Sequence, residues 1–375
     1  MKKWAIIGGG IQGSTLAIYL VKKKKARVEE IEIIDPHEEP LALWKEYTKR
    51  IGMPYLRSPS VHHLDVPPFG LEKYGKTYSK EWKKLFNPPY DRPSLAVFNS
   101  HSVDVFRGIG LEASWKQGRV QHLERENPHW KLYLCSGETV KAKQVALAFG
   151  ITEQPYWPEW ALEKKGRGDE IYHVFGESLP AFEQLSAPFV IYGGGISAAH
   201  LSLKLSKKYP GNVTLKMRHP FRTQQFDADP GWMGARRMKE YSKIKNYEKR
   251  RMLIKEARHR GSMPAELKTA ISKAAKSKQL RIVQDQETFE TFEQEGTILL
   301  ATGFRPDPPG MEWLRSTMER EKLPVATCGY PILSETLEWG KGLYAIGALA
   351  ELQIGPVSRN IAGARRGALK IVGAL

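Results

Sequence analysis

The pattern of hydrophobic and polar residues repeats itself along this chain of 375 residues. Residues 4–20 (WAIIGGGIQGSTLAIYL) and 189–205 (FVIYGGGISAAHLSLKL) each begin with a short apolar run, continue with a glycine cluster and end with leucines at helical spacing. This order is typical of a strand, a tight turn and a helix. We therefore expect two copies of one strand–turn–helix unit.

A second pair of similar segments supports this interpretation. Residues 145–150 (VALAFG) and 298–303 (ILLATG) are apolar runs that end in glycine. Such runs are typical of buried parallel strands whose carboxyl ends face a ligand. The predicted fold class is therefore α/β, with two Rossmann-like dinucleotide-binding domains.

The first glycine cluster has the spacing Gly8-x-Gly10-x-x-Gly13. The first glycine permits a sharp turn, the second lets the backbone approach a pyrophosphate, and the third allows the helix to pack closely on the strand. The helix that begins near Ile11 and Gln12 would direct free N–H groups and its positive dipole end toward the phosphates. This turn is a candidate cofactor site.

The second cluster repeats the pattern with one change. Gly193 and Gly195 occupy the first two positions, and the small residue Ala198 occupies the third. Ile196 and Ser197 begin the helix of this unit and are candidate cofactor contacts for the same reason.

The residue that ends the following strand differs between the two units. The run IEIID ends in Asp35, 22 residues after Gly13, where a carboxylate can accept hydrogen bonds from an adenosine ribose. The run VTLKMR ends in Arg218, 20 residues after Ala198, where a guanidinium can pair with a 2′-phosphate. The first site is therefore expected to bind FAD and the second to prefer NADPH.

On these residues the sequence resembles the flavoproteins with two dinucleotide-binding domains. Within that group it is most similar to the flavin-dependent monooxygenases that include the lysine and ornithine N-hydroxylases. Further residues that carry the resemblance are Thr302 and Gly303 in the run ATGFRP and Gly347 in the C-terminal run from 342 to 369. The resemblance implies a discontinuous FAD-binding domain (1–160 and 296–375) and an NADPH-binding domain (185–295) with a basic helical insertion (231–277).

The resemblance also implies an activity, in which hydride passes from NADPH to FAD and then to O2, and a small amine-type substrate is hydroxylated. Two motifs depart from the family pattern. The fingerprint Phe-x-Gly-x-x-x-His-x-x-x-Trp is absent, and a Gly-Asp pair of many flavoproteins is replaced by Gly347-Ala348. The alternative is an NADPH:acceptor reductase without oxygen insertion. A third hypothesis is a dinucleotide-binding module that contacts nucleic acid or another anionic partner.

The catalytic candidates also follow from the resemblance. It places residues 54–64 beside the flavin ring, so Arg57 and Ser58 are candidate flavin or substrate contacts. It directs the N-terminus of a C-terminal helix at the flavin, which makes Gln353 and Ser358, together with Glu351, candidate substrate contacts. The pair His62-His63 has no acidic partner at ligand spacing, and we expect a structural role and no metal site there.

Several local elements are predicted from pattern alone. Residues 119–126 and 130–135 are expected to form a hairpin, and Arg236–Arg260 a helix that packs its apolar face on the domain. A further helix should run from Pro264 to Lys276, with Ser262 as its N-cap. Residues 356–366 are expected to start the C-terminal helix. Asp227 and Asp229 could bind a cationic amine or cap the helix that follows.

The chain has an excess of positive charge, and much of it lies in one segment. The chain carries 58 Lys and Arg against 41 Asp and Glu, a net charge of +17. Residues 236–260 contain eleven Lys or Arg and three Glu, which gives +8 in this segment alone. The excess favours anionic partners such as phosphorylated cofactors. A solvated helix face is a better explanation of the basic segment than a nucleic-acid site.

The chain has two cysteines, Cys135 and Cys328, which are too few for a disulfide framework and therefore indicate a reducing compartment. They also form no Cys-x-x-Cys pair. The uncharged run from Trp4 to Val21 contains the glycine cluster, which neither an export signal nor a membrane helix would accept. We expect a cytoplasmic protein that acts on a small molecule without a membrane partner. A homo-oligomer is compatible with the sequence.

Overall fold

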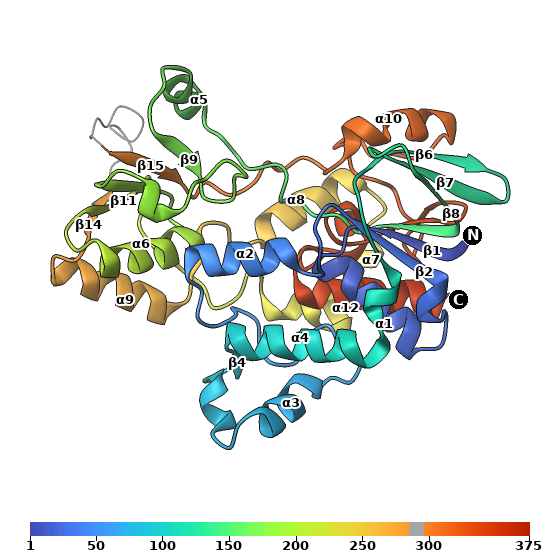
Figure 1. The fold of residues 1–375 in the computed structure, drawn as a ribbon, viewed down its shortest axis with the longest axis horizontal. Coiled ribbons are helices and arrows are strands. Elements are labelled where there is room, and N and C mark those ends of the chain that lie inside the picture. Colours follow the sequence, from blue (N-terminus) through green and yellow to red (C-terminus); the bar gives the residue numbers. More distant parts are fainter. Residues whose placement is uncertain (285–295) are drawn as a thin grey trace.

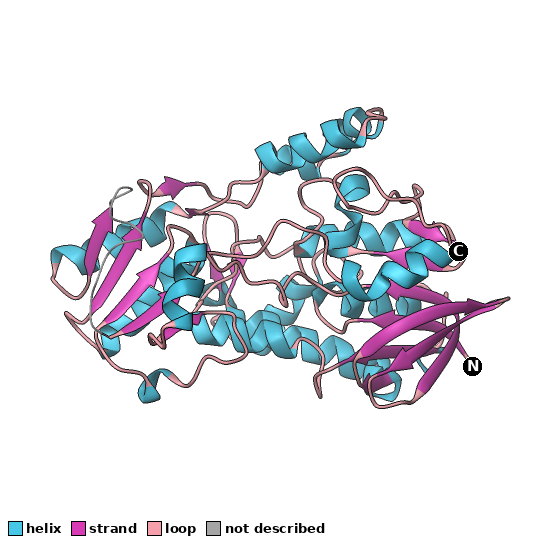
Figure 2. Cartoon of the chain, turned by 90° about the horizontal axis from the view of Figure 1, so that it is seen from above, coloured by secondary structure: helices cyan, strands magenta, loops and turns pink. Residues whose placement is uncertain are grey.

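Two separate sheets divide the chain into two lobes (Figure 1). The structure, a computed structural model, describes residues 1–284 and 296–375. The first lobe contains the sheet β16-β17-β8-β1-β2-β5, and the second lobe contains the sheet β14-β11-β10-β15-β9. Both chain ends lie in the first lobe, and the view in Figure 2 shows the same division.

The first sheet is built around the strand that precedes the first glycine cluster. Its parallel strands are β1 (Lys2–Ile7), β2 (Ile31–Asp35), β5 (Trp115–Gln117), β8 (Thr139–Leu147) and β17 (Leu343–Ala345). The strand β16 (Glu338–Gly340) is antiparallel, and a hairpin of β6 (Val120–Glu126) and β7 (His129–Leu134) pairs with β8. The predicted hairpin is therefore confirmed.

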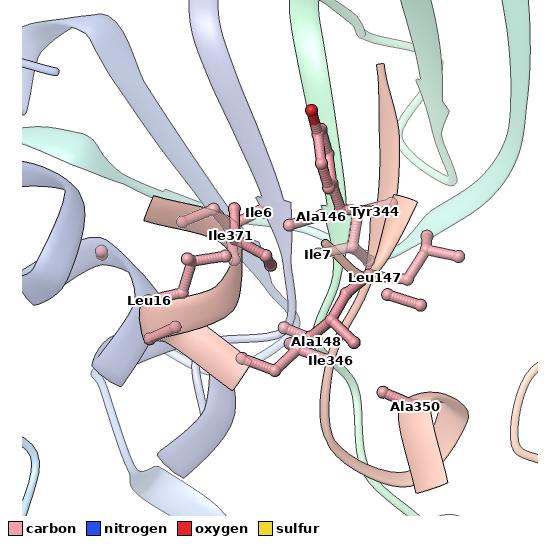
Figure 3. Packing of buried hydrophobic residues seen from close by; sticks show 14 of the residues in the cluster. Ile6, Ile7, Leu16, Ala146, Leu147, Ala148, Tyr344, Ile346, Ala350 and Ile371 are labelled. Carbon is pink, nitrogen blue, oxygen red and sulfur yellow. The ribbon is translucent and has the colours of Figure 1, made fainter. Parts of the chain in front are cut away.

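Helices pack on this sheet through small and aliphatic residues. The helix α1 (Ile11–Lys22) lies against α12 (Ile361–Gly373) and α4 (Leu95–Ile109). Figure 3 shows Ile6, Leu16, Ile346 and Ile371 packed together, and all four are less than 1% exposed. Burial of such a side chain stabilises a fold by about 1.5–3 kcal/mol, so this cluster holds the first glycine turn in place.

The second sheet repeats the arrangement with five parallel strands. They are β9 (Ile171–His173), β10 (Phe189–Tyr192), β11 (Val213–Met217), β14 (Arg281–Gln284) and β15 (Thr297–Leu300). The helices α6 (Ile196–Lys208) and α9 (Ala265–Lys276) pack together on it, and α5 (Glu159–Gly166) lies beside β9. The predicted fold class is confirmed. The domain boundaries stay predictions, and the boundary at 295 lies outside the described residues.

The basic segment differs from its prediction. It forms two helices, α7 (Ala235–Ser242) and α8 (Tyr247–Ala257), because the Asn246 side chain accepts a hydrogen bond from Lys249 N and starts a new helix. Tyr241 and Ile254 belong to the hydrophobic core of the first lobe. The segment therefore returns to the first lobe, and the prediction of a single helix is wrong.

Three further predictions need correction or refinement. The helix α9 forms as expected, but Ser262 lies in the strand β13 (Ser262–Met263), and Pro264 occupies the N-cap position. The C-terminal helix begins at Ile361, five residues later than predicted, with Asn360 as its N-cap. Asp229 caps a 3-10 helix through Gly231 N.

The remaining elements are short or peripheral. They are the helices α2 (Ala42–Ile51), α3 (Gly70–Tyr78), α10 (Met311–Arg320) and α11 (Glu351–Ile354), the strands β3 (Phe86–Asn87), β4 (Arg92–Pro93) and β12 (Arg222–Thr223), and the 3-10 helices η1 (Val28–Glu30), η2 (Trp82–Leu85), η3 (Leu111–Ser114), η4 (Phe182–Gln184), η5 (Pro230–Met233) and η6 (Gly347–Ala350). Across the described ranges, helices that combine the length and apolar character needed to cross a bilayer are absent.

Two of the segments that connect the lobes, residues 148–170 and 301–310, contact each other, and α2 adds further contacts between the lobes. Tyr156 N donates to Gly303 O at 2.9 Å, and Arg305 N donates to Gln154 O at 2.8 Å, so the two connections run side by side. The helix α2 belongs to the first lobe but packs on α6 of the second. Lys204 Nζ donates to the carbonyls at the end of α2. These contacts fix the lobes around the space between them.

Candidate functional site

One large cavity lies between the two lobes. Its volume is about 1050 Å3, and its walls contain the first glycine turn, the end of β2, the helix α2, both connecting segments and the start of α6. Several walls are aromatic, with Trp44 and Tyr47 on one side and Phe149, Phe304 and Trp313 on others. A concave, largely apolar space with a few polar groups is the usual form of a cofactor site.

The first glycine turn forms part of this wall. Gly8 has a φ of +102°, and a Cβ there would lie 2.8 Å from Phe149 N. At Gly13 a Cβ would collide with the carbonyl oxygen of Gly8, whereas at Gly10 it would meet no described atom within 4 Å. The turn therefore has the predicted geometry, with tight packing at its first and third glycines and open space at the second. Ligand binding there stays a prediction.

Asp35 lies beside this turn, at the end of β2. Its Oδ2 accepts a hydrogen bond from Gly9 N at 2.6 Å, and its Oδ1 lies 2.7 Å from His37 Nδ1. Both Asp35 and His37 line the cavity. The carboxylate therefore lies in the cavity wall next to the turn, and its binding to a ribose stays a prediction.

Three predicted residues from distant segments meet behind the turn. Gln12 Nε2 donates to the Ser358 and Asn360 carbonyls at 3.3 Å, and a Cβ at Gly347 would lie 2.7 Å from Gln12 Cγ. The Ser358 hydroxyl is buried and donates to Gly347 O. Gln12 Oε1 is buried with no hydrogen-bond partner among the described residues. Other atoms of Gln12 line the cavity.

The second glycine turn approaches the cavity only through the start of its helix. Ile196 and Ser197 line the cavity. Gly193 has a φ of +152°, and a Cβ there would lie 2.6 Å from Ala301 O, so close packing requires glycine. Ala198 is buried beneath the turn, and Gly195 faces Gly261 at 3.4 Å from its Cβ position.

The other predicted residues of the second unit surround this turn. Arg218 directly follows β11 and is exposed. Thr302 Oγ1 donates to Tyr156 O, and Gly303 O accepts from Tyr156 N, so the ATG run holds the two connecting segments together.

The catalytic candidates lie elsewhere. Arg57 donates to the carbonyls of residues 224–226, to Asp227 Oδ1 at 2.7 Å and to Ser262 Oγ at 2.9 Å. Gln353 Oε1 accepts from Arg250 Nη1 at 2.9 Å. Among the described residues that line the large cavity, Arg57, Gln353 and Ser358 are absent. Arg57, Ser58 and Asp227 line a small pocket of about 20 Å3 beside Asn360.

A buried charge cluster was missed in the sequence. The Glu351 carboxylate is fully buried and is paired with Arg251, with Arg359 Nε at 2.7 Å and with Arg258 Nη2 at 3.5 Å. Burial, then the charge of Arg359, lowers the pKa of Arg258 to about 9. Arg359 also lines the cavity. Arg251 and Arg258 were hidden within a basic run that pointed to solvent.

Comparisons with known proteins agree with this geometry. Residues 5–152 match a protein-family model described as FAD-NAD(P)-binding. The structure is similar to an ornithine N-hydroxylase from Kutzneria sp. 744 in complex with reduced FAD, NADP+ and L-ornithine, with a TM-score of 0.78 and 12% identity over 100% of this chain and 98% of the other. The chain has the fold of the flavin-dependent N-hydroxylases.

Two other similar structures show the range of this fold. The cadaverine monooxygenase from Erwinia amylovora bound to FAD has a TM-score of 0.74 and 14% identity over 99% of this chain and 93% of the other. The bacillithiol disulfide reductase from Staphylococcus aureus has a TM-score of 0.64 and 15% identity over 100% and 97%. A sequence comparison with curated proteins gave no match.

In this N-hydroxylase fold, the aromatic wall from α2 was also missed. Trp44, Tyr47, Thr48 and Ile51 follow helical spacing and line the cavity, although no helix was predicted there. That short amphipathic pattern was the available signal.

One member of the histidine pair lies in the protein interior. His63 is fully buried, its Nδ1 accepts from Asp65 N at 3.1 Å, and burial lowers its pKa to about 3. Throughout residues 1–284 and 296–375, no group of three His, Cys, Asp or Glu is arranged to hold a metal ion.

Proposed function

We propose that the chain is an FAD- and NADPH-dependent oxidoreductase that uses O2 to hydroxylate a small amine substrate. The observation that carries the proposal is that the walls of one shared cavity contain both the first glycine turn and the start of the helix after the second. Two cofactors bound at these places would meet in one enclosed space. The fold of ornithine and cadaverine N-hydroxylases supports the same reaction class.

The first site fits the pyrophosphate and ribose of FAD. The open space at Gly10 lets the backbone approach a phosphate, and α1 directs its N-terminal N–H groups there. Asp35 is placed to accept from ribose hydroxyls, and Gln12 Oε1 is a buried acceptor without a described partner. We assign Gly8, Gly10, Ile11, Gln12, Gly13, Asp35 and Gly347 to this site.

The second site fits NADPH. The start of α6 at Ile196 and Ser197 reaches the cavity, and Arg218 follows the next strand with an exposed cationic side chain. A guanidinium there can pair with a 2′-phosphate, which NADH lacks. We assign Gly193, Gly195, Ile196, Ser197, Ala198 and Arg218 to NADPH, and Thr302 and Gly303 to the connection between the two sites, where they are bonded to Tyr156.

When bound, FAD supplies the redox chemistry by accepting hydride from NADPH and passing electrons to O2. The chain supplies orientation and a site shielded from water. We propose Arg57, Gln353 and Ser358 as positioning residues. Arg57 holds the loop 224–227, Gln353 anchors Arg250, and Ser358 fixes Gly347 behind the turn.

We also propose a division into an FAD-binding domain at 1–160 and 296–375 and an NADPH-binding domain at 185–295. The packing of α7 and α8 on the first core supports placing residues 231–260 with the FAD-binding domain instead. Two free cysteines, Cys135 and Cys328, support a reducing compartment such as the cytoplasm.

The test is rapid mixing of the NADPH-reduced, FAD-loaded protein with O2, with and without amines such as L-lysine, L-ornithine and cadaverine. We expect one hydroxylated amine per NADPH for at least one of them. Stoichiometric H2O2 with every amine would refute oxygen insertion. Fast turnover with a quinone or disulfide acceptor, together with slow O2 consumption, would favour the reductase.

A further inference from the structure

The helix α2 is anchored in both lobes, and in Figure 1 it lies between them beside α6. At its first end, Leu41 N donates to Gly9 O of the first glycine turn at 3.2 Å. One turn later, Trp44 Nε1 donates to Asn99 Oδ1 of α4 at 3.0 Å. At its other end, Ile51 is 6% exposed and belongs to the hydrophobic core of the second lobe. This helix of ten residues therefore reaches from a candidate cofactor turn to the opposite lobe.

Two cationic side chains hold the second end of α2. Arg50 Nη1 donates to Val174 O at 3.0 Å and to Gly176 O at 3.1 Å, and the Arg50 side chain is 14% exposed. Lys204 Nζ donates to Lys49 O and to Arg50 O, both at 3.0 Å. The last carbonyls of a helix carry the negative end of its dipole, so an ammonium group is favourable there.

The lysine connects α2 to the second glycine turn. Lys204 lies on α6, and the first residues of α6, Ile196 and Ser197, follow that turn and line the cavity. The contacts therefore run from Gly9 O along α2 to Lys204, and from there along α6 to the second turn. Because hydrogen-bonded helices are stiff elements, the anchors of α2 set the spacing of the two turns.

The same helix forms a wall of the cavity, through the residues already described. Tyr47 of this wall donates through its hydroxyl to Phe175 O at 2.9 Å, and the two rings lie 5.0 Å apart. Among the described residues that line the cavity, Arg50 and Lys204 are absent. They would therefore act on a bound cofactor through α2 and not by contact.

We propose that Arg50 and Lys204 are positioning residues for hydride transfer, because they hold α2 and thereby fix the distance between the two cofactor turns. This inference rests on the proposed function and deepens it. In the step concerned, NADPH gives up a hydride and becomes NADP+, and FAD accepts that hydride and becomes the anionic reduced flavin. Reacting atoms must approach to about 3–3.5 Å, and a misplacement of about 1 Å can slow a reaction by about 100-fold.

Anaerobic mixing of the FAD-loaded protein with NADPH separates positioning from binding. Arg50→Met and Lys204→Met should each lower the limiting rate of flavin reduction by about 10- to 100-fold and leave the Kd of NADPH nearly unchanged. Lys204→Arg, which keeps a cationic donor, should restore most of the rate. The matched control is Lys208→Met, one turn further along α6, where the lysine pairs with Glu183 on the surface. It should change neither quantity.

Hydrogen exchange provides a measurement that does not depend on activity. In the FAD-loaded protein without NADPH, both Met variants should speed exchange at the end of α2, including Gly52 N, which donates to Lys49 O at 3.1 Å. Exchange in β1 should stay unchanged. Faster exchange and a lower limiting rate are expected together, and either effect without the other would overturn the proposal. A weaker Kd for NADPH with an unchanged limiting rate would also overturn it.

The failure of this inference differs from the failure of the proposed function. A wild-type flavin that NADPH does not reduce would refute the function. Equally fast reduction in the wild type and in both Met variants would keep the function and refute the role of Arg50 and Lys204. If Arg50→Met does not fold, Lys204→Met decides alone, because Lys204 is exposed and its replacement leaves both hydrophobic cores intact.

Discussion

The two glycine turns share a sequence pattern but differ in their surroundings. Gly8, Gly9 and Gly13 of the first turn are buried, and the side chain of Gln12 ties the turn to the C-terminal segment. Residues 193–197 of the second turn are all partly exposed. The same local motif therefore forms one largely buried turn and one partly exposed turn.

This difference suits two cofactors with different tasks. A buried turn that the C-terminal segment supports from behind favours slow dissociation, because the turn is held in one conformation. A partly exposed turn allows a second ligand to exchange in every cycle. For the proposed function, we expect FAD to stay bound through gel filtration and NADP+ to be lost.

The largest expected effect comes from exchanging the residues at the third position of the two turns. Gly13→Ala places a Cβ against the carbonyl of Gly8, so it should destabilise the fold by about 3 kcal/mol and release FAD. Ala198→Gly, the matched change in the second turn, should cost about 1 kcal/mol through helix propensity. For both variants, urea unfolding measures the free energy of unfolding and flavin absorbance measures the bound FAD. Equal effects would remove the distinction between the turns.

Lowering the pH should weaken both lobes. Burial lowers the pKa of His63 in the first lobe to about 3 and that of His173 in the second to about 4, from 6.5. The unfolded chain takes up protons below pH 6.5 while these folded-state histidines stay neutral. The free energy of unfolding should therefore fall between pH 6.5 and 4, by up to about 3 kcal/mol for each histidine.

Urea unfolding between pH 4 and 8 tests this expectation. His63→Gln and His173→Gln should each flatten the decline. A free energy of unfolding that stays constant, or rises, as the pH falls below 6.5 would contradict it.

Coenzyme choice tests the partly exposed turn. Arg218→Ala should lower kcat/KM for NADPH by about 10- to 100-fold and leave that for NADH nearly unchanged, because only NADPH carries the 2′-phosphate. The rate of flavin reduction by each coenzyme under anaerobic conditions measures this preference. Lys207→Ala, an exposed cation near the other end of α6, is the control. Equal loss with both coenzymes would refute the pairing.

The smallest expected effect concerns the link between the lobes. Arg57→Lys keeps the charge but cannot reach all five acceptors around the loop 224–227. It should cost about 1–2 kcal/mol and speed hydrogen exchange in that loop. Arg27→Lys, in a pair whose arginine is 79% exposed, should change neither measurement. If hydrogen exchange in the loop 224–227 is unchanged in Arg57→Lys, Arg57 has no positioning role.

Much of the fold could be predicted because its signals are local. The apolar run before Gly8 and the leucines after it identify a strand and a helix wherever the rest of the chain lies. The break between α7 and α8 was missed because the cap at Asn246 competes with a periodic pattern that continues through it. A capping residue inside such a pattern is easy to overlook.

The candidate site was predicted less completely. The sequence singled out Arg57 and Asp227 separately. It did not predict that they form an ion pair at 2.7 Å, or that neither of them lines the large cavity. Glu351 was predicted to meet substrate, and it is instead fully buried under three arginines. No property of residues 251, 258 and 359 in the sequence indicates that they share one partner.

The sequence by itself determined the two strand–turn–helix units, their order and the charge that ends the strand after each. Glycine spacing and apolar periodicity restrict the backbone within a few residues, so they act before any long-range contact forms. Only the tertiary structure decided which turn is largely buried and which arginine faces the cavity. Those outcomes depend on how segments more than a hundred residues apart in the sequence pack against each other. They also depend on which charged side chains are buried away from solvent.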